Sequence, residues 1–520
     1  MTQAALRPVD VRWWLLAFAA GTAVVVGFWW MAHRTIYPIL PDSTAYLEMA
    51  RSVQHTGRFE VVPYALTESS ATTQPTALWP PLFPVIIAAV SRLGIADVTA
   101  APLINRVCFA LLPALLVWAL AGYASARRVC VAGMLALTAP GVLATQYFGL
   151  SEGLAALCLI VSVGCALRTD RRAMLVLSGV CGGAAYVTRN PALAICAAIP
   201  CWLVLESMRE APARVLAWGI GALLVIAPLW GYNLAVFGQV QPYAAPASTT
   251  GIVQNIHALT VSITGEILGA RGVDRRITGS GLSSVITVVL LGAALWTWRA
   301  SRSRAHDGRA VRLLLLVAAA MCALLVAAAS RYQFQGLHEH RFVVPFLWTL
   351  FAVGAIIFPS APSAVRRLAI GSVVLLAGAR GYDSWQRAAQ QAQTRDGALA
   401  GALAGALAVA HDGALQRYLV GQHEPQLFVA SNAAWVLRAE TGTATRQLLF
   451  CPEYADQITQ LTTLVVSGRP VQVIITSGVT GDHCETAWIL ALQQRGFVRV
   501  FTSPQSVVYR KALSLPIRQS

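Results

Sequence analysis

The sequence is poor in charge. Only 12% of its 520 residues are Asp, Glu, Lys or Arg, whereas 56% are hydrophobic. Soluble proteins carry roughly 25% charged residues, so this composition excludes a soluble globular protein and predicts an integral membrane protein. Lysine is nearly missing too, because Lys511 is the one lysine of the chain. Almost all cationic chemistry must therefore be done by arginine.

Zinc-type cysteine spacing is also lacking. The chain has no CxxC or Cys/His pattern, and eight of its ten cysteines lie inside apolar runs, where they are expected as small buried hydrophobes. The other two are Cys451 and Cys484, and whether they pair depends on geometry that sequence does not supply. The net charge of +16 does not indicate a nucleic-acid partner. Most arginines lie in short gaps between apolar runs, as the positive-inside rule describes.

Apolar runs recur along the chain at lengths that cross, or nearly cross, a hydrocarbon core of roughly 30 Å. They lie at residues 13–32, 103–121, 129–147, 149–167, 173–189, 191–206, 214–232, 281–299, 312–330, 342–358 and 365–381. The segment 79–93 holds three prolines, so we expect it to lie at the interface rather than to span. If 79–93 does not span, the arginines in the loops between apolar runs lie on the same side of the membrane as Arg7 and Arg12. This predicts about 11 uncleaved spans, a cytoplasmic N-terminus and an external C-terminus.

This topology gathers the unusual polar segments on the outer face, where they can converge. They are residues 33–78, 147–153, 189–190, 233–280, 331–341 and everything beyond 382. Beyond 382 the composition becomes polar. A helical stretch at 396–420 precedes strand-like runs at 426–430, 471–476 and 497–509. We therefore expect a transmembrane domain over 1–382 and a small α/β domain over 383–520.

The segment PDSTAYLEMAR follows the first span and opens a helical pattern. Asp42 comes directly after Pro41, where it can cap the helix. Tyr46 and Met49 follow Asp42 at helical spacing, which predicts an amphipathic helix lying along the interface. A carboxylate would then stand where water meets lipid.

Five short motifs resemble those of a known family. They are D-S-x-x-Y-x-x-x-A from Asp42, P-P-L-F-P at 80–84, S-E at 151–152, T-R-N-P at 188–191 and H-R-F-V-V-P at 340–345. Their order and common side resemble the polyprenyl-phosphate-dependent glycosyltransferases of the GT-C superfamily, in the bacterial protein-mannosyltransferase-like and aminoarabinose-transferase-like branches. The resemblance covers about residues 10–380. It implies a polytopic α-helical GT-C-like fold with interfacial helices and a small periplasmic α/β domain.

The same resemblance implies a reaction. An inverting enzyme of the bacterial inner membrane would move a sugar from a polyprenyl-phosphate donor to a hydroxyl of a glycan, lipid or protein acceptor at the periplasmic face. Asp42 would be the catalytic base, since a positioned carboxylate that takes the hydroxyl proton contributes roughly 10²–10⁴ in rate. Glu152 matches the second acidic position of the family, to place the acceptor or hold a metal. The alternative role of Glu152 is structural, because the dipole of a helix favours a glutamate at the start of that helix.

The leaving lipid phosphate needs cations, and here they must be arginines. Arg341 and Arg189 each stand at the edge of an apolar run, and planar guanidinium suits bidentate phosphate binding. Anchoring to lipid headgroups is the alternative role. Further donor or substrate-binding candidates are His338, His340, Tyr46 and Arg58. The adjacent His338, Glu339 and His340 suit hydrogen bonding to the donor or a metal site, so a divalent metal requirement stays open.

The sequence also departs from the family. Ser43 follows Asp42 where eukaryotic protein mannosyltransferases carry a second acid, and Trp79 stands where aminoarabinose transferases can place a lysine. The second departure puts an aminoarabinose donor in doubt. Two other functions compete. A lipid-linked-sugar flippase or transporter would favour ionisable residues inside the spans and repeat symmetry. An O-antigen-ligase-type transferase would place its catalytic loop late in the chain.

Overall fold

The computed structural model describes most of the chain, in two compact units. The described residues are 10–33, 38–62, 73–169, 171–242, 247–268, 307–332, 340–357, 407–421, 427–441, 445–448, 454–466, 470–476 and 482–511, with a few single residues between them. The first unit comprises residues 1–29, 77–83 and 103–386. The second comprises residues 30–76, 84–102 and 387–520. The predicted domain boundary at 382 lies outside the described residues and stays a prediction.

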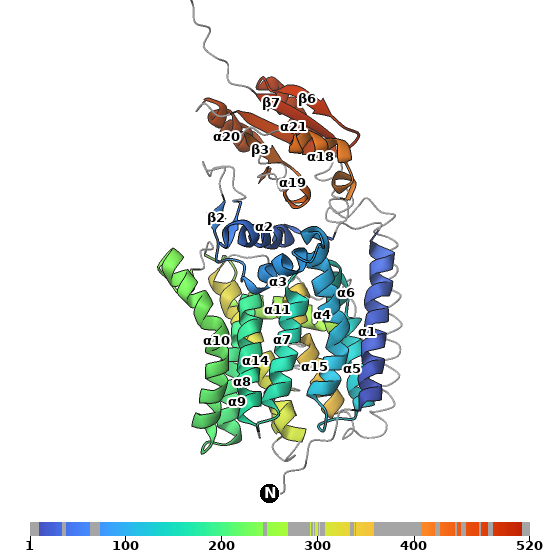
Figure 1. Ribbon diagram of the computed structural model, residues 1–520, viewed down its shortest axis with the longest axis vertical. Coiled ribbons are helices and arrows are strands. Elements are labelled where there is room, and N and C mark those ends of the chain that lie inside the picture. The colour runs from blue at the N-terminus through green and yellow to red at the C-terminus, as the bar shows by residue number, and fades with distance from the viewer. Residues whose placement is uncertain are drawn as a thin grey trace, which may run out of the picture. The chain divides into compact units, whose positions relative to one another are not determined.

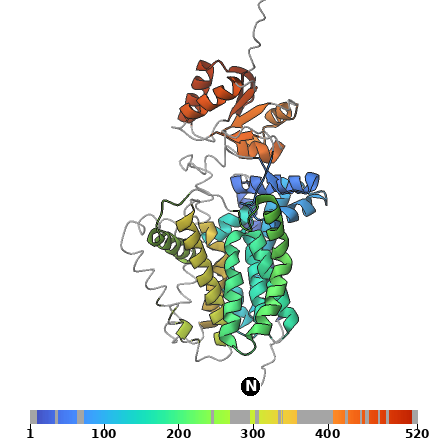
Figure 2. The same cartoon turned by 90° about the vertical axis from the view of Figure 1, so that its left-hand side faces the viewer.

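The first unit is built from apolar helices, several of which run side by side in both views (Figures 1 and 2). The described helices are α1 (Val11–Ala32), α4 (Asp97–Ala119), α5 (Ala126–Leu137), α6 (Pro140–Tyr147), α7 (Glu152–Ala166), α8 (Arg172–Thr188), α9 (Ala194–Glu206), α10 (Ala211–Phe237), α11 (Ile252–Leu268), α14 (Asp307–Arg331) and α15 (Val344–Ile357), with the 3₁₀ turns η1 (Asn190–Leu193) and η3 (His340–Phe342). Among them α8 packs against α7 and α10, while α14 packs against α9 and α15. The first residues of α4 and the last of α1 belong to the second unit.

Helix length and composition bear out a polytopic membrane protein. Four described helices, α1, α4, α10 and α14, are long and apolar enough to cross a membrane. The predicted span 365–381 and nearly all of 281–299 lie outside the described residues. Helix α3 (Leu82–Ser91) has 10 residues and is about 15 Å long. It is too short to cross the hydrocarbon core, in agreement with the expectation for 79–93.

The apolar run at 129–147 is not one continuous helix, because α5 and α6 are separate helices bent by 68°. The break lies at Ala139, which is extended at φ −61° and ψ 140° and directly precedes Pro140. A proline disfavours the helical conformation of the residue before it and lacks the N–H that would continue the ladder. The pair is a broken span or a re-entrant segment.

The predicted loop at 233–280 also contains helix. There α10 continues to Phe237, and α11 occupies 252–268. A search for apolar runs misses α11 because several of its buried residues are polar. These are Asn255, Thr260, Ser262, Thr264 and Glu266.

Close helix packing explains two glycines of the first unit. A Cβ at Gly179 of α8 would lie 2.0 Å from the carbonyl oxygen of Trp218, and one at Gly221 of α10 would lie 2.0 Å from that of Val176. Neither position tolerates a side chain without moving a backbone. The two helices therefore approach as closely as small-residue interfaces of membrane helices do.

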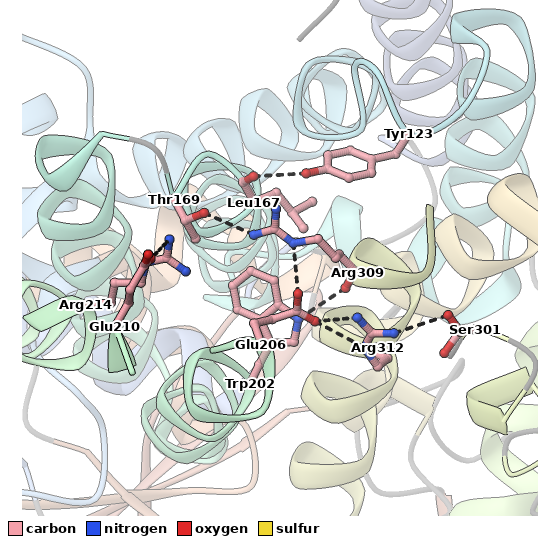
Figure 3. Close-up of polar contacts among 10 residues, drawn as sticks. All are labelled: Tyr123, Leu167, Thr169, Trp202, Glu206, Glu210, Arg214, Ser301, Arg309 and Arg312. Atoms are coloured by element: carbon pink, nitrogen blue, oxygen red, sulfur yellow. Dashed lines mark hydrogen bonds and ion pairs between the residues drawn. The ribbon is translucent and has the colours of Figure 1, made fainter. Parts of the chain in front are cut away.

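Ion pairs link helices at one end of the first unit (Figure 3). Glu206, the last residue of α9, is 2.9 Å from Nε of Arg309 and 2.6 Å from Nη2 of Arg312, both at the start of α14. Trp202 donates its indole N–H to the Arg309 carbonyl at 3.2 Å, and Arg309 donates to Thr169 at 3.0 Å. Because consecutive helices alternate in direction, this is the end opposite the start of α7 and the end of α8.

The second unit combines α2 (Pro41–Thr56), a two-stranded ribbon and an α/β domain. Strands β1 (Glu60–Val61) and β2 (Gln74–Pro75) pair antiparallel. The C-terminal domain contains α18 (Gly413–Val420), β3 (Phe428–Ser431), α19 (Ala434–Thr441), β4 (Thr445–Gln447), α20 (Tyr454–Val466), β5 (Val471–Thr476), α21 (Asp482–Gln494), β6 (Val498–Thr502) and β7 (Ser506–Lys511). The predicted strand 497–509 is thus a hairpin of two strands, and β4 was not predicted.

The five-stranded sheet has the order β4-β3-β5-β7-β6, with β3 parallel to β4 and β5. All six residues of β5 are buried, as expected for a central strand covered on both faces. The chain runs from β3 to β4 on one side, and from β4 it crosses back to β5 on the other side of β3, which creates a topological switch point at the strand ends. There the Asn432 amide donates to the Thr476 carbonyl at 2.8 Å and accepts the Thr476 N–H at 2.9 Å. Asn432 thereby ties β3 to β5 immediately before α19 begins.

Candidate functional site

The predicted base stands in the first turn of α2. The helix begins at Pro41 after Leu40, so Leu40 is the N-cap and Asp42 is the second helical residue. The alternative role of Asp42 as N-cap is therefore wrong. Ser43 serves this end of the helix instead, because its hydroxyl accepts the Leu40 N–H at 3.1 Å. Proline suits the first helical position, and the helix dipole favours an acid beside it. Gly57, at φ 73°, ends the helix in the left-handed conformation that favours glycine.

Burial distinguishes α2 from an amphipathic surface helix. All residues from Ser43 to Ala50 are buried, on the polar and the apolar sides alike. The expected one-sided burial of an amphipathic helix is not seen, because β1 and α19 pack against α2 within the second unit. Asp42 itself is half-buried. At about 100° per residue, Tyr46 and Met49 lie on the same side of the helix as Asp42, as the sequence predicted.

Two predicted arginines from distant turns of the first unit lie at one aromatic ring, and a predicted acid pairs with one of them. The Glu152 carboxylate is 2.8 Å from Nη1 of Arg189, and its side chain is fully buried. The Arg189 guanidinium lies 5.5 Å from the centre of the Phe342 ring, and the Arg341 guanidinium lies 5.3 Å from it. These distances are within the range of cation–π attraction. The fold thus places two arginines at Phe342 and pairs one of them, Arg189, with Glu152.

A proline determines where the helix that presents Arg189 ends. Helix α8 stops at Thr188, and Arg189 is extended at φ −155° and ψ 122°. Pro191 has no N–H to continue the α8 ladder, so the chain turns into η1. Asn190 donates to the Leu78 carbonyl at 3.3 Å and fixes this turn. The motif T-R-N-P therefore ends a helix with an arginine side chain directed to Glu152.

A buried asparagine shapes the turn that presents Glu152. Asn105 of α4 donates to the carbonyls of Thr145 and Phe148, each at 2.8 Å, and accepts the Gly153 N–H at 3.0 Å. A Cβ at Gly153 would lie 2.4 Å from the Asn105 side-chain oxygen. Glycine after Glu152 is thus required for this contact. The sequence analysis missed Asn105, whose signal was a lone amide in an apolar run.

The sequence analysis also missed Glu266 of α11. Its two carboxylate oxygens accept the Gly141 N–H, at 2.9 and 2.7 Å, in the first turn of α6. The carboxylate satisfies an N–H that the helix itself leaves unpaired and complements the dipole of that end. The available signal was that Glu266 is the one Asp, Glu, Lys or Arg in the segment 252–268.

The remaining predicted residues are not part of these clusters or are not described. Arg58 is exposed and lies 3.9 Å from Glu60 in the second unit. Tyr46 is buried within α2. The side chains of His338 and His340 lie outside the described residues, as do those of Cys451 and Cys484. Within the described part of the chain, no group of three or more His, Cys, Asp or Glu residues could hold a metal ion.

Solved structures show which fold this is. ArnT from Cupriavidus metallidurans, bound to undecaprenyl phosphate, is similar at a TM-score of 0.60 and 14% identity, over 96% of this chain and 98% of its own. The archaeal oligosaccharyltransferase AglB from Archaeoglobus fulgidus, in complex with an inhibitory peptide and a dolichol-phosphate, is similar at 0.53 and 10%, over 98% and 75%. Arabinofuranosyltransferase AftD from Mycobacteria is similar at 0.52 and 16%, over 97% and 40%.

These three proteins are GT-C glycosyltransferases, and the chain has the GT-C fold that the sequence predicted. No family model and no curated protein matches the sequence. The likeness is one of fold, which by itself does not assign a reaction.

Proposed function

We propose that the protein is an inverting glycosyltransferase of the bacterial inner membrane. It moves a sugar from a polyprenyl-phosphate carrier to a hydroxyl of a glycan, lipid or protein acceptor at the outer face. Asp42 takes the proton from the acceptor hydroxyl as that oxygen attacks the anomeric carbon. The bond to the carrier phosphate breaks, and the lipid phosphate leaves.

One observation carries this proposal beyond the fold. Arg189 and Arg341 come from turns that are about 150 residues apart, yet both guanidinium groups lie over Phe342. Two guanidinium groups at the ends of apolar helices are a chemically suitable cradle for a lipid phosphate, since each offers paired N–H donors and a fixed charge. They would neutralise the charge that develops on the leaving oxygen. The undecaprenyl phosphate bound to ArnT and the dolichol-phosphate bound to AglB favour the same class of donor.

Glu152 has a supporting role in this proposal. Its fully buried carboxylate pairs with Arg189, which favours a function in aiming that guanidinium rather than in touching the acceptor. Asp42 is the better base, because it is half-buried and not sealed from solvent. A single carboxylate suffices for direct displacement, since the phosphate leaves without protonation.

The test is transfer of radiolabelled sugar by the purified protein in lipid from a panel of polyprenyl-phosphate sugars. The wild type is compared with Asp42→Asn, which keeps the size of the side chain and removes the base. We expect kcat to fall by more than about a hundredfold. Asp10→Asn is the matched control, because Asp10 is an exposed acid before α1, and it should leave transfer unchanged.

Two results would contradict the proposal. Undiminished transfer by Asp42→Asn would move the base elsewhere. Absence of transfer from any donor, together with donor-dependent movement of lipid-linked sugar across the bilayer, would favour the flippase.

A further inference from the structure

A buried ion pair joins the C-terminal domain to the helix that carries Asp42. Arg438 of α19 is 1% exposed, and Glu48 of α2 is 9% exposed. The Nε and Nη2 groups of Arg438 both donate to the Glu48 carboxylate, one to each oxygen. The same Nη2 donates to the Val62 carbonyl at 2.7 Å, and the Val62 N–H donates to Glu48 at 2.9 Å. The pair is thus bidentate and further hydrogen-bonded.

Two more residues of α2 bind the backbone of α19. The Arg51 guanidinium donates to the carbonyls of Arg438, at 2.7 Å, and Ala439, while its Nε is 2.5 Å from Asp97. The Thr44 hydroxyl donates to the Trp435 carbonyl at 3.0 Å. Carbonyls near the end of a helix are the groups that lack partners within it. All of these residues belong to the second unit.

The three contacting positions form one stripe of α2. Thr44, Glu48 and Arg51 are spaced i, i+4 and i+7, so they lie on one face of the helix. Asp42 is about 200° around the helix from Thr44, on the opposite face. The C-terminal domain therefore holds one side of α2 and leaves the side of Asp42 uncovered by α19.

The α19 side of the contact is anchored as well. Helix α19 follows the central strand β3 after two residues, and Asn432 binds β3 to β5 at that point. Arg438 is therefore attached to the sheet rather than to a loose loop.

The chemistry of the contact fixes direction as well as proximity. An apolar contact tolerates a helix that slides or rotates slightly, because dispersion and burial are not directional. A bidentate guanidinium–carboxylate pair is planar and tolerates neither. Glu48 lies about 9 Å along the helix from Asp42, so a rotation allowed at Glu48 would move Asp42 with it.

We propose that Arg438 is a positioning residue for Asp42, and that the C-terminal domain sets the orientation of α2 through Glu48, Arg51 and Thr44. This inference rests on the proposed function, in which Asp42 is the base. It gives the C-terminal domain a part in the transfer step, beyond any part in choosing the acceptor.

The test is a double-mutant cycle between Arg438→Met and Asp42→Asn, with transfer measured on the full-length protein in lipid. We expect Arg438→Met to lower kcat by about 30-fold or more and to change the KM for donor by less than about threefold. In the Asp42→Asn background the same substitution should change the residual rate by less than about threefold, because there is no base left to position. Arg438→Lys should recover part of the loss, because it keeps a charge that reaches Glu48.

A control and a milder variant complete the design. Arg499→Met changes an exposed arginine of strand β6 in the same domain, and transfer should stay unchanged. Thr44→Val removes one hydrogen bond to α19 and serves if Arg438→Met does not fold. We expect it to lower kcat about three- to tenfold, again only when Asp42 is present.

The outcomes separate this inference from the proposed function. An equal fractional loss with and without Asp42, or an unchanged kcat in Arg438→Met, overturns the positioning role and leaves Asp42 as base. Undiminished transfer in Asp42→Asn alone overturns the assignment of the base and the positioning role with it.

Discussion

The Glu152–Arg189 pair allows the sharpest test of the phosphate cradle. Glu152→Gln keeps the size of the side chain and one acceptor oxygen but removes the charge that holds the Arg189 guanidinium. The Glu152 side chain is fully buried and that of Arg189 is 12% exposed, so solvent screens the pair little. We expect Arg189 to lose its fixed direction toward the phosphate.

The size of the effect follows from the contact. A hydrogen bond to a charged group contributes about 1.5–3 kcal/mol, and the glutamine oxygen keeps part of it. A loss of about 1.4–2 kcal/mol of transition-state stabilisation corresponds to a decrease of about 10- to 30-fold in kcat/KM for the donor. The full loss of a buried partner, about 3–5 kcal/mol, sets the upper limit.

Glu206→Gln is the matched control at the other end of the same unit. Glu206 is also a glutamate bound by arginines, Arg309 and Arg312, and its side chain is 8% exposed (Figure 3). We expect it to lower the unfolding temperature while leaving kcat/KM per folded molecule unchanged. The assay pairs steady-state transfer in lipid with thermal unfolding of each variant in one detergent. The proposed phosphate cradle of Arg189 and Arg341 is refuted if both variants reduce transfer per folded molecule equally. It is also refuted if Glu152→Gln leaves transfer unchanged.

Two further predictions concern glycines where the fold leaves no room for a side chain. Gly153→Ala would place a Cβ 2.4 Å from the Asn105 side-chain oxygen and so shift the start of α7. We expect transfer to fall at least tenfold. Gly27→Ala is the control and should leave transfer unchanged, because a Cβ at Gly27 has nothing within 4 Å. Gly179→Leu would press α8 against a backbone carbonyl of α10, and we expect little folded protein by size-exclusion chromatography. Gly219→Leu faces open space on α10 and should fold normally; equal yields of these last two variants would refute the close packing.

Local patterns in the sequence determined much of this protein. Length and hydropathy predicted most described helices of the first unit, though not α11, because every backbone polar group must be satisfied inside a membrane. The strand at 471–476 was predicted from its run of β-branched residues. The edges of apolar runs pointed to Arg189 and Arg341, and the resemblance to a known family pointed to Glu152. The roles of these residues stay predictions.

Tertiary structure decided what local patterns do not encode. Helix α11 escaped the hydropathy search because its buried residues include amides, hydroxyls and Glu266, which are stable only through partners elsewhere. The pair of Glu48 and Arg438 is the clearest case, because its members are 390 positions apart in the sequence. Each looked like an ordinary helical charge, and helical periodicity relates residues no more than a few turns apart. Sequence therefore placed Asp42 on a helix, and only the fold showed what holds that helix in place.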